Sequence, residues 1–128
     1  MNDISLLERR ISVNALGMEG PHTLDEVCIG SLGLEASPGN YALGYTNSGG
    51  DFVVCFVGRS DDDLSARLLS WVGRSEFRQF KFSYAGSPEE AFEKECETYH
   101  HFKPIGNRMH PSRPIGTGWK CPRCPFFD

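Results

Sequence analysis

The sequence predicts an α+β fold in which helices flank a small three-stranded sheet, mixed or antiparallel, and an irregular C-terminal tail follows. Three observations support this prediction. Short runs of β-branched and aromatic residues have the length and composition of strands. Two other segments repeat apolar residues at helical spacing. Residues 108–128 are rich in glycine and proline and follow neither period, so they need something to hold them in place.

Composition narrows the class of protein. The chain has 128 residues, of which 39% are hydrophobic, and this suits one modest core. Its net charge of −4 is unlike that of proteins that coat nucleic acid, so any such contact is expected to be local. No secretory leader and no apolar run of about 20 residues is evident, which predicts a cytoplasmic, intracellular protein without a membrane partner. Five cysteines in such a protein favour metal or catalytic use over disulfides.

The first two segments are an N-terminal extension and a hairpin. Residues 1–37 are expected to be an extension that is mainly helical, with Asp3 capping one short helix and Thr23 capping another through a capping box with Glu26. A domain is expected to begin at residue 38 and end at residue 107. Its first part, "YALGYT" and "FVVCFVG" joined by "NSGGD", is typical of a β-hairpin.

The rest of the domain is expected to be a helix, a strand and a second helix. Ser60 is a candidate cap for a helix whose apolar face includes Leu64 and Leu68. "FRQFKFSY" alternates as a half-buried strand does. "SPEEAFEKECETYHHF" predicts a helix that is capped by Ser87 and stopped by Pro104.

Charged residues at the edges of both apolar helix faces are unusual. Arg67 lies next to Leu68, and Glu95 borders the apolar stripe of the last helix. A partly buried ion pair between Arg67 and Glu95 would explain both. The alternative is a catalytic site, and the order of short motifs along the chain supports it. "PGNY" with Tyr41 opens the hairpin, "FVG" closes it, "DLSARL" follows, and Glu95 precedes a proline by nine residues and Asn107 by twelve.

This order of motifs resembles that of the GIY-YIG nuclease superfamily over residues 38–107. The resemblance implies an endonuclease that hydrolyses phosphodiester bonds of DNA or RNA. It implies that Glu95 holds one Mg²⁺ or Mn²⁺ ion, that Tyr41 acts beside the attacking water as base or positioner, and that Arg67 neutralises the phosphate. It also assigns Asn107 to the site, and Arg59 is a further candidate for phosphate contact. One carboxylate with water is a normal magnesium site, and the ion and Arg67 would stabilise transition-state charge.

The sequence departs from the superfamily pattern at two positions, where Phe56 and Trp71 replace polar residues. The alternative to an enzyme is therefore a catalytically degenerate module of the same fold that binds or scaffolds. Tyr45 is the alternative to Tyr41 as the first-motif tyrosine, because it restores the usual spacing to Phe56. A targeting protein partner is also expected, since a lone acidic nuclease domain has little affinity of its own.

A second metal site is expected near the C-terminus. Cys121 and Cys124 form a Cys-x2-Cys knuckle, and Cys96 and His100 lie four residues apart on one helix face. Together they would make a structural Cys3His zinc site that attaches the tail, residues 108–128, to the domain.

Alternatives remain for several of these residues. Cys96 also lies on the apolar stripe, where a core role is the alternative. His101 and His110 are alternatives to His100 as zinc ligand. Arg108, His110 and Arg113 form either a basic edge for a nucleic-acid backbone or a polar loop.

Overall fold

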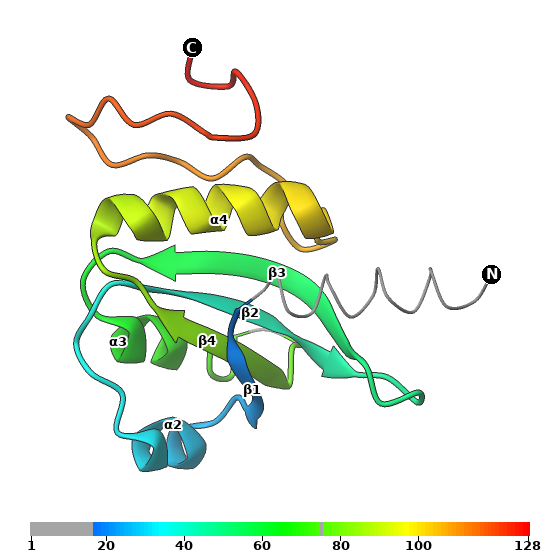
Figure 1. Cartoon of the computed structure of the whole chain (residues 1–128). Coiled ribbons are helices and arrows are strands. Elements are labelled where there is room, and N and C mark those ends of the chain that lie inside the picture. Colours follow the sequence, from blue (N-terminus) through cyan, green and yellow to red (C-terminus); the bar gives the residue numbers. More distant parts are fainter. Residues whose placement is uncertain (1–16, 75) are drawn as a thin grey trace.

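An antiparallel sheet is the centre of the computed structural model, which describes residues 17–74 and 76–128 (Figure 1). Its strands are β1 (Glu19–Thr23), β2 (Gly39–Thr46), β3 (Phe52–Ser60) and β4 (Gln79–Tyr84), in the spatial order β1-β4-β2-β3. The helices are α2 (Glu26–Leu32), α3 (Leu64–Leu69) and α4 (Pro88–Phe102). The predicted α+β class and antiparallel pairing are confirmed.

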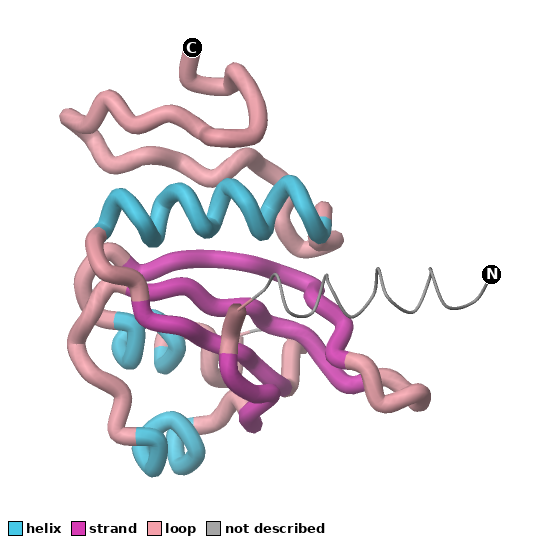
Figure 2. The backbone as a smooth tube through the Cα atoms, in the orientation of Figure 1, coloured by secondary structure: helices cyan, strands magenta, loops and turns pink. Residues whose placement is uncertain are grey.

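The helices cover both faces of the sheet. Alternate residues of β2 point to opposite sides, so Tyr41 and Leu43 pack with α2 and α3, whereas Ala42 packs with Val57 and with the last turns of α4. After α4 the chain turns back and runs along the outer side of that helix without further helix or strand (Figure 2). The helix α4 therefore lies between the sheet and the tail, in contact with both.

The prediction of three strands was wrong, because β1 adds a fourth at the edge beside β4. The segment "EGPHT" has no apolar alternation and contains a proline. Proline is tolerated on edge strands and at bulges, and the pairing of β1 with β4 does shift register between Glu19 and His22. Within the predicted N-terminal extension, the described residues 17–37 therefore contain both the edge strand β1 and the helix α2. The helix expected after Asp3 lies outside the described residues.

Two predicted helix caps were also wrong, and both true caps lie two or three residues later. Asp25, not Thr23, caps α2 by accepting a hydrogen bond from the Cys28 amide. Asp63, not Ser60, caps α3, because β3 extends as far as Ser60. The cap of α4 at Ser87 is confirmed, with the Glu90 amide as donor.

The β2–β3 hairpin requires a glycine opposite Tyr41. Tyr41 pairs with Gly58 in this ladder, and the hydroxyl end of its ring lies next to that position. A Cβ atom at residue 58 would lie 2.4 Å from the Tyr41 hydroxyl oxygen. The glycine of the "FVG" motif therefore provides the space in which the tyrosine side chain lies.

Candidate functional site

A pocket of about 390 Å³ is lined by residues of β2, β3, α3 and α4. Tyr41 enters it from β2, Arg67 from α3 and Glu95 from α4. The complete lining is Tyr41, Phe56, Gly58, Arg59, Ser60, Asp61, Asp62, Arg67, Glu95 and Ser112. Four of the five residues that were predicted to be catalytic therefore share one pocket, although they come from four different elements.

The hydroxyl of Tyr41 is held in one orientation. Its side chain is 1% exposed, and Trp71 Nε1 donates a hydrogen bond of 2.9 Å to its oxygen. Trp71 packs in turn on Phe56, with ring centroids 4.8 Å apart. Burial raises the pKa of Tyr41, and the nearby Arg67 only partly opposes this. The phenol is therefore protonated near neutrality. Tyr45, the alternative tyrosine, is 49% exposed and pairs with Val53, so it is not part of the pocket.

Glu95 forms an ion pair with Arg59 rather than with Arg67. Arg59 Nη1 donates to Glu95 Oε1 at 2.5 Å and Nε donates to Asp61 Oδ1 at 2.8 Å. Both side chains of the Arg59–Glu95 pair are nearly buried, at 10% and 12% exposure. Burial raises the pKa of Glu95, and Arg59 opposes the rise. Burial disfavours the charge on Arg59 too, but its bonds to Asp61 and Glu95 outweigh that and raise its pKa.

Arg67 is the exposed cation of the pocket. It lies near enough to Tyr41 and Glu95 to favour the charged form of each, so it partly opposes the rise that burial causes in the pKa of both groups. It also lines a smaller cavity with Trp71 and Arg74. An incoming anion could therefore meet Arg67 without first breaking a buried ion pair, whereas Arg59 is already engaged.

Asn107, the fifth residue predicted to be catalytic, makes structural hydrogen bonds outside the pocket. Its Oδ1 accepts from the Val57 amide at 2.8 Å and its Nδ2 donates to the Val57 carbonyl at 2.9 Å. Both ends of the side-chain amide thus bind the backbone of β3, and Asn107 does not line the pocket. It fixes the loop after α4 to the sheet.

Sequence reasoning missed several lining residues. Ser60, Asp61 and Asp62 belong to "RSDDD", a run typical of a solvated helix start. Only the fold shows that they lie in the same pocket as Arg59 and Glu95. Ser112 comes from the tail. No sequence signal places a residue of an irregular tail at a pocket formed by the sheet.

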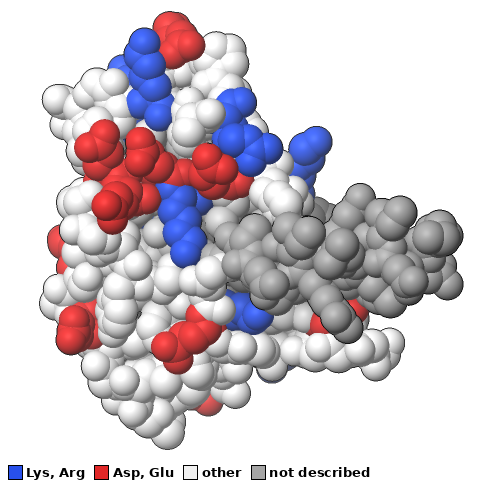
Figure 3. Space-filling view, viewed as in Figure 1, with Lys and Arg blue, Asp and Glu red and all other residues white. Residues whose placement is uncertain are grey.

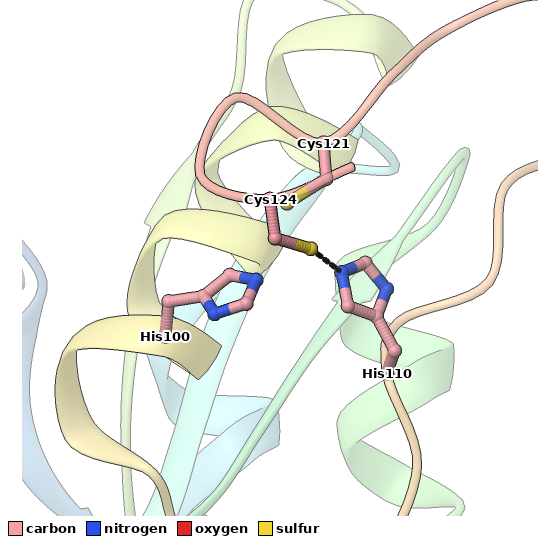
Figure 4. Close-up of side chains that lie close together, drawn as sticks. All are labelled: His100, His110, Cys121 and Cys124. Atoms are coloured by element: carbon pink, nitrogen blue, oxygen red, sulfur yellow. Dashed lines mark hydrogen bonds between the residues drawn. The ribbon is translucent and has the colours of Figure 1, made fainter. Parts of the chain in front are cut away.

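A second group of side chains could hold a metal. One ligand atom from each of His100, His110, Cys121 and Cys124 lies within 4.8 Å of the others (Figure 4). His110 takes the position that was predicted for Cys96. Cys96 is fully buried beside Phe92 and Cys121, as a core residue is, and burial raises the pKa of its thiol. His100 remains in the group, and burial lowers the pKa of its imidazole.

Charge is distributed unevenly over the surface. Figure 3 shows acidic side chains gathered over α4, whose exposed glutamates are Glu89, Glu90, Glu93 and Glu97. Of the two interpretations of residues 108–113, a basic edge and a polar loop, the basic edge has less exposed charge than the sequence indicates. Arg108 is exposed, but Arg113 donates to the Trp119 carbonyl at 2.8 Å and lies over the Phe127 ring.

Comparison with known proteins gave no match, whether with protein-family models, with curated proteins or with solved structures. The resemblance to the GIY-YIG superfamily therefore rests on the motifs alone. Among residues 17–74 and 76–128, no helix is long and apolar enough to cross a membrane.

Proposed function

We propose that this protein is a metal-dependent phosphodiesterase, an endonuclease of the GIY-YIG type that acts on DNA or RNA. The observation that carries the proposal is the meeting of Tyr41, Arg67 and Glu95 in one pocket. These residues are 26 and 28 positions apart in sequence, and sequence motifs alone predict all three as site residues. A tyrosine hydroxyl, an accessible guanidinium and a buried carboxylate are the groups that such hydrolysis needs.

The donor set and charge of the pocket suit a hard divalent cation such as Mg²⁺ or Mn²⁺. Carboxylate and hydroxyl oxygens are the ligands these ions prefer. With two arginines and three carboxylates ionised, the pocket has a net charge of −1, which repels a phosphate. A divalent ion would change this to +1. Glu95 is the residue expected to hold the ion, which when bound would stabilise negative charge on the phosphate.

Each residue of the pocket has a separate role in this proposal. Arg67 binds the phosphate and neutralises charge that develops on it. Tyr41 remains protonated because burial raises its pKa, so it orients the attacking water or passes on a proton rather than acting as a preformed phenolate. Trp71 holds that hydroxyl in place. Arg59 positions the Glu95 carboxylate through their hydrogen bond.

One observation favours the second candidate, a binding or scaffold module without catalysis. Arg59 already engages one oxygen of Glu95 and has only 10% of its side chain exposed, so the carboxylate has fewer positions left for an ion. In this case nucleic acid or protein would bind at the pocket without turnover. The acidic surface over α4 opposes nucleic-acid contact there, so a targeting protein in the cytoplasm is part of either proposal.

Cleavage of mixed single- and double-stranded DNA and RNA by the full chain tests the proposal. We expect turnover that needs Mg²⁺ or Mn²⁺ and that falls about 10²–10³-fold in Glu95→Gln, the loss typical when a group that stabilises the transition state is removed. Glu93→Gln is the matched control, because Glu93 lies on the exposed side of the same helix. It should cleave like the wild type.

Two outcomes would overturn the nuclease proposal. One is cleavage that Glu95→Gln retains in full, which would indicate a contaminant or another site. The other is no cleavage of any substrate by folded wild-type protein with either ion. Binding of nucleic acid that survives Glu95→Gln, without turnover, would support the scaffold candidate.

A further inference from the structure

Three separate segments of the chain supply the His/Cys group that could hold a metal. His100 lies in the last turn of α4, His110 in the loop that follows, and Cys121 and Cys124 in the tail. Figure 4 shows the four side chains converging on one space between α4 and the tail. Cys124 Sγ and His110 Nε2 are 3.3 Å apart. Tetrahedral zinc, with bonds of about 2.3 Å to sulfur and about 2.0 Å to nitrogen, separates such ligand atoms by about 3.5 Å.

The two histidines have the hydrogen bonding expected of metal ligands. His110 Nδ1 lies 2.8 Å from the Pro111 carbonyl. A carbonyl can only accept, so Nδ1 carries the proton and Nε2 presents its lone pair to the cluster. His100 Nε2 is buried and has no hydrogen-bond partner in the described structure. Leaving a buried polar atom unsatisfied is costly, and a metal ion in the cluster would remove that cost.

Backbone amides point at the cysteine sulfurs. The Arg123 amide donates to Cys121 Sγ at 3.4 Å, and the Phe126 amide makes the same kind of bond to Cys124. Each donor is two residues after its cysteine, so the Cys-x2-Cys turn repeats one geometry twice. Such bonds stabilise thiolates, the form in which cysteine binds metal. Two thiolates would also balance the charge of a divalent ion.

We propose that His100, His110, Cys121 and Cys124 bind one structural Zn²⁺ ion, which attaches the tail to α4 and thereby holds Ser112 at the wall of the pocket. Thiolate and imidazole ligands select zinc over magnesium or calcium, and four protein ligands leave no open position for a reacting molecule. Ser112 lies two residues after His110 and lines the pocket. The zinc site does not depend on the proposed nuclease activity.

Metal content of the purified full chain, without a histidine tag, tests the site. We expect about one zinc per chain, and loss of it in Cys124→Ser and in His110→Ala. Cys96→Ser and His101→Ala are the matched controls, because each is a cysteine or histidine of α4 next to the cluster but outside it. Both should retain the zinc.

A second measurement avoids variants that fail to fold. Wild-type protein is stripped of zinc and titrated with Co²⁺, whose visible absorption reports tetrahedral geometry and the number of thiolate ligands. We expect tetrahedral bands with two thiolates, unchanged in Cys96→Ser. Zinc-free wild-type protein should also be cut by trypsin after Arg108 or Lys120 several-fold faster than the zinc form, because the tail has lost its attachment.

The proposal is overturned if the wild type has no zinc and Co²⁺ gives only octahedral absorption. A cobalt spectrum that indicates three thiolates in the wild type and two in Cys96→Ser would show that Cys96, and not His110, is the fourth ligand. If trypsin cleaves the protein at the same rate with and without zinc, the proposal that zinc attaches the tail is overturned. None of these measurements involves nucleic acid, so they fail or succeed separately from the nuclease assay.

Discussion

The pocket and the His/Cys cluster differ in how the chain builds them. Most residues of the pocket stand on β2, β3, α3 and α4, and strand pairing sets the spacing of those on the strands, as for Tyr41 opposite Gly58. The cluster has one ligand on a helix and three in segments without regular structure. Hydrogen-bonded elements hold the pocket without any ligand. The loops around the cluster lack such support, because residues 103–128 contain neither helix nor strand.

If both proposed metal ions bind, this difference predicts that the ion of the cluster supports the fold and that the ion of the pocket serves the chemistry. Removing an ion from the pocket should leave the protein folded, because Arg59 already neutralises Glu95. Removing the ion from the cluster would leave two thiols and two imidazoles together, with His100 Nε2 buried and unpaired. Metal binding at sites of the second kind contributes directly to folding.

The largest effect on the pocket, apart from that of Glu95, is expected at Arg67. Arg67→Met keeps an unbranched apolar stem but removes the guanidinium charge that would meet the phosphate. Cleavage should fall about 10²-fold, while the free energy of unfolding changes by less than about 0.5 kcal/mol, because Arg67 is exposed. Cleavage rates and urea denaturation of the same preparation measure both. If the free energy of unfolding falls by as much as the activation free energy of cleavage rises, the role of Arg67 is structural.

Gly58→Ala tests whether strand pairing fixes the pocket. The new methyl group would lie 2.4 Å from the Tyr41 hydroxyl oxygen, so the ring must move, at a cost of about 1–3 kcal/mol in the free energy of unfolding. Gly30→Ala is the control, because a Cβ there meets no atom within 4 Å, and in α2 it should stabilise by up to about 1 kcal/mol. Equal stability of Gly58→Ala and wild type would contradict the described packing of Tyr41.

The smallest expected effect is a difference in pH dependence between the two sites. Burial raises the pKa of Glu95 above its ordinary value of 4.5, and only the ionised carboxylate binds a cation. Mn²⁺ affinity should therefore be full above that pKa and weaken about tenfold per pH unit below it, because one proton competes. Release of zinc should be steeper, since two thiolates and two imidazoles compete for protons. Titrations of each ion between pH 4 and pH 8 would compare the slopes, and equal slopes would contradict the assigned ligand sets.

Sequence reasoning succeeded where a local signal determines the structure. The capping residue and proline of α4 fixed its beginning, and the apolar period fixed its buried face, so Glu95 was correctly placed beside that face. Strand β1 was missed because edge pairing with β4, not its own composition, makes it a strand. The ion pair of Glu95 with Arg59 joins residues 36 positions apart in different elements, and no local pattern indicates it.

The proposed zinc ligands show the same limit of sequence reasoning. The Cys-x2-Cys spacing and the position of His100 on α4 are local signals, and both residues of the knuckle and His100 belong to the cluster. The fourth ligand depends on the path of the loop after α4. Asn107 fixes that loop to β3 through two hydrogen bonds, and His110, three residues later, lies within reach of both knuckle sulfurs.

The most direct test of the separation between the two sites is to measure zinc content and metal-dependent cleavage on one preparation of Glu95→Gln. We expect about one zinc per chain, as in the wild type, together with the loss of cleavage by about 10²–10³-fold. Undiminished cleavage would show that the pocket does not perform the chemistry. Loss of zinc together with cleavage would show that the two sites are not separate, and would contradict the account.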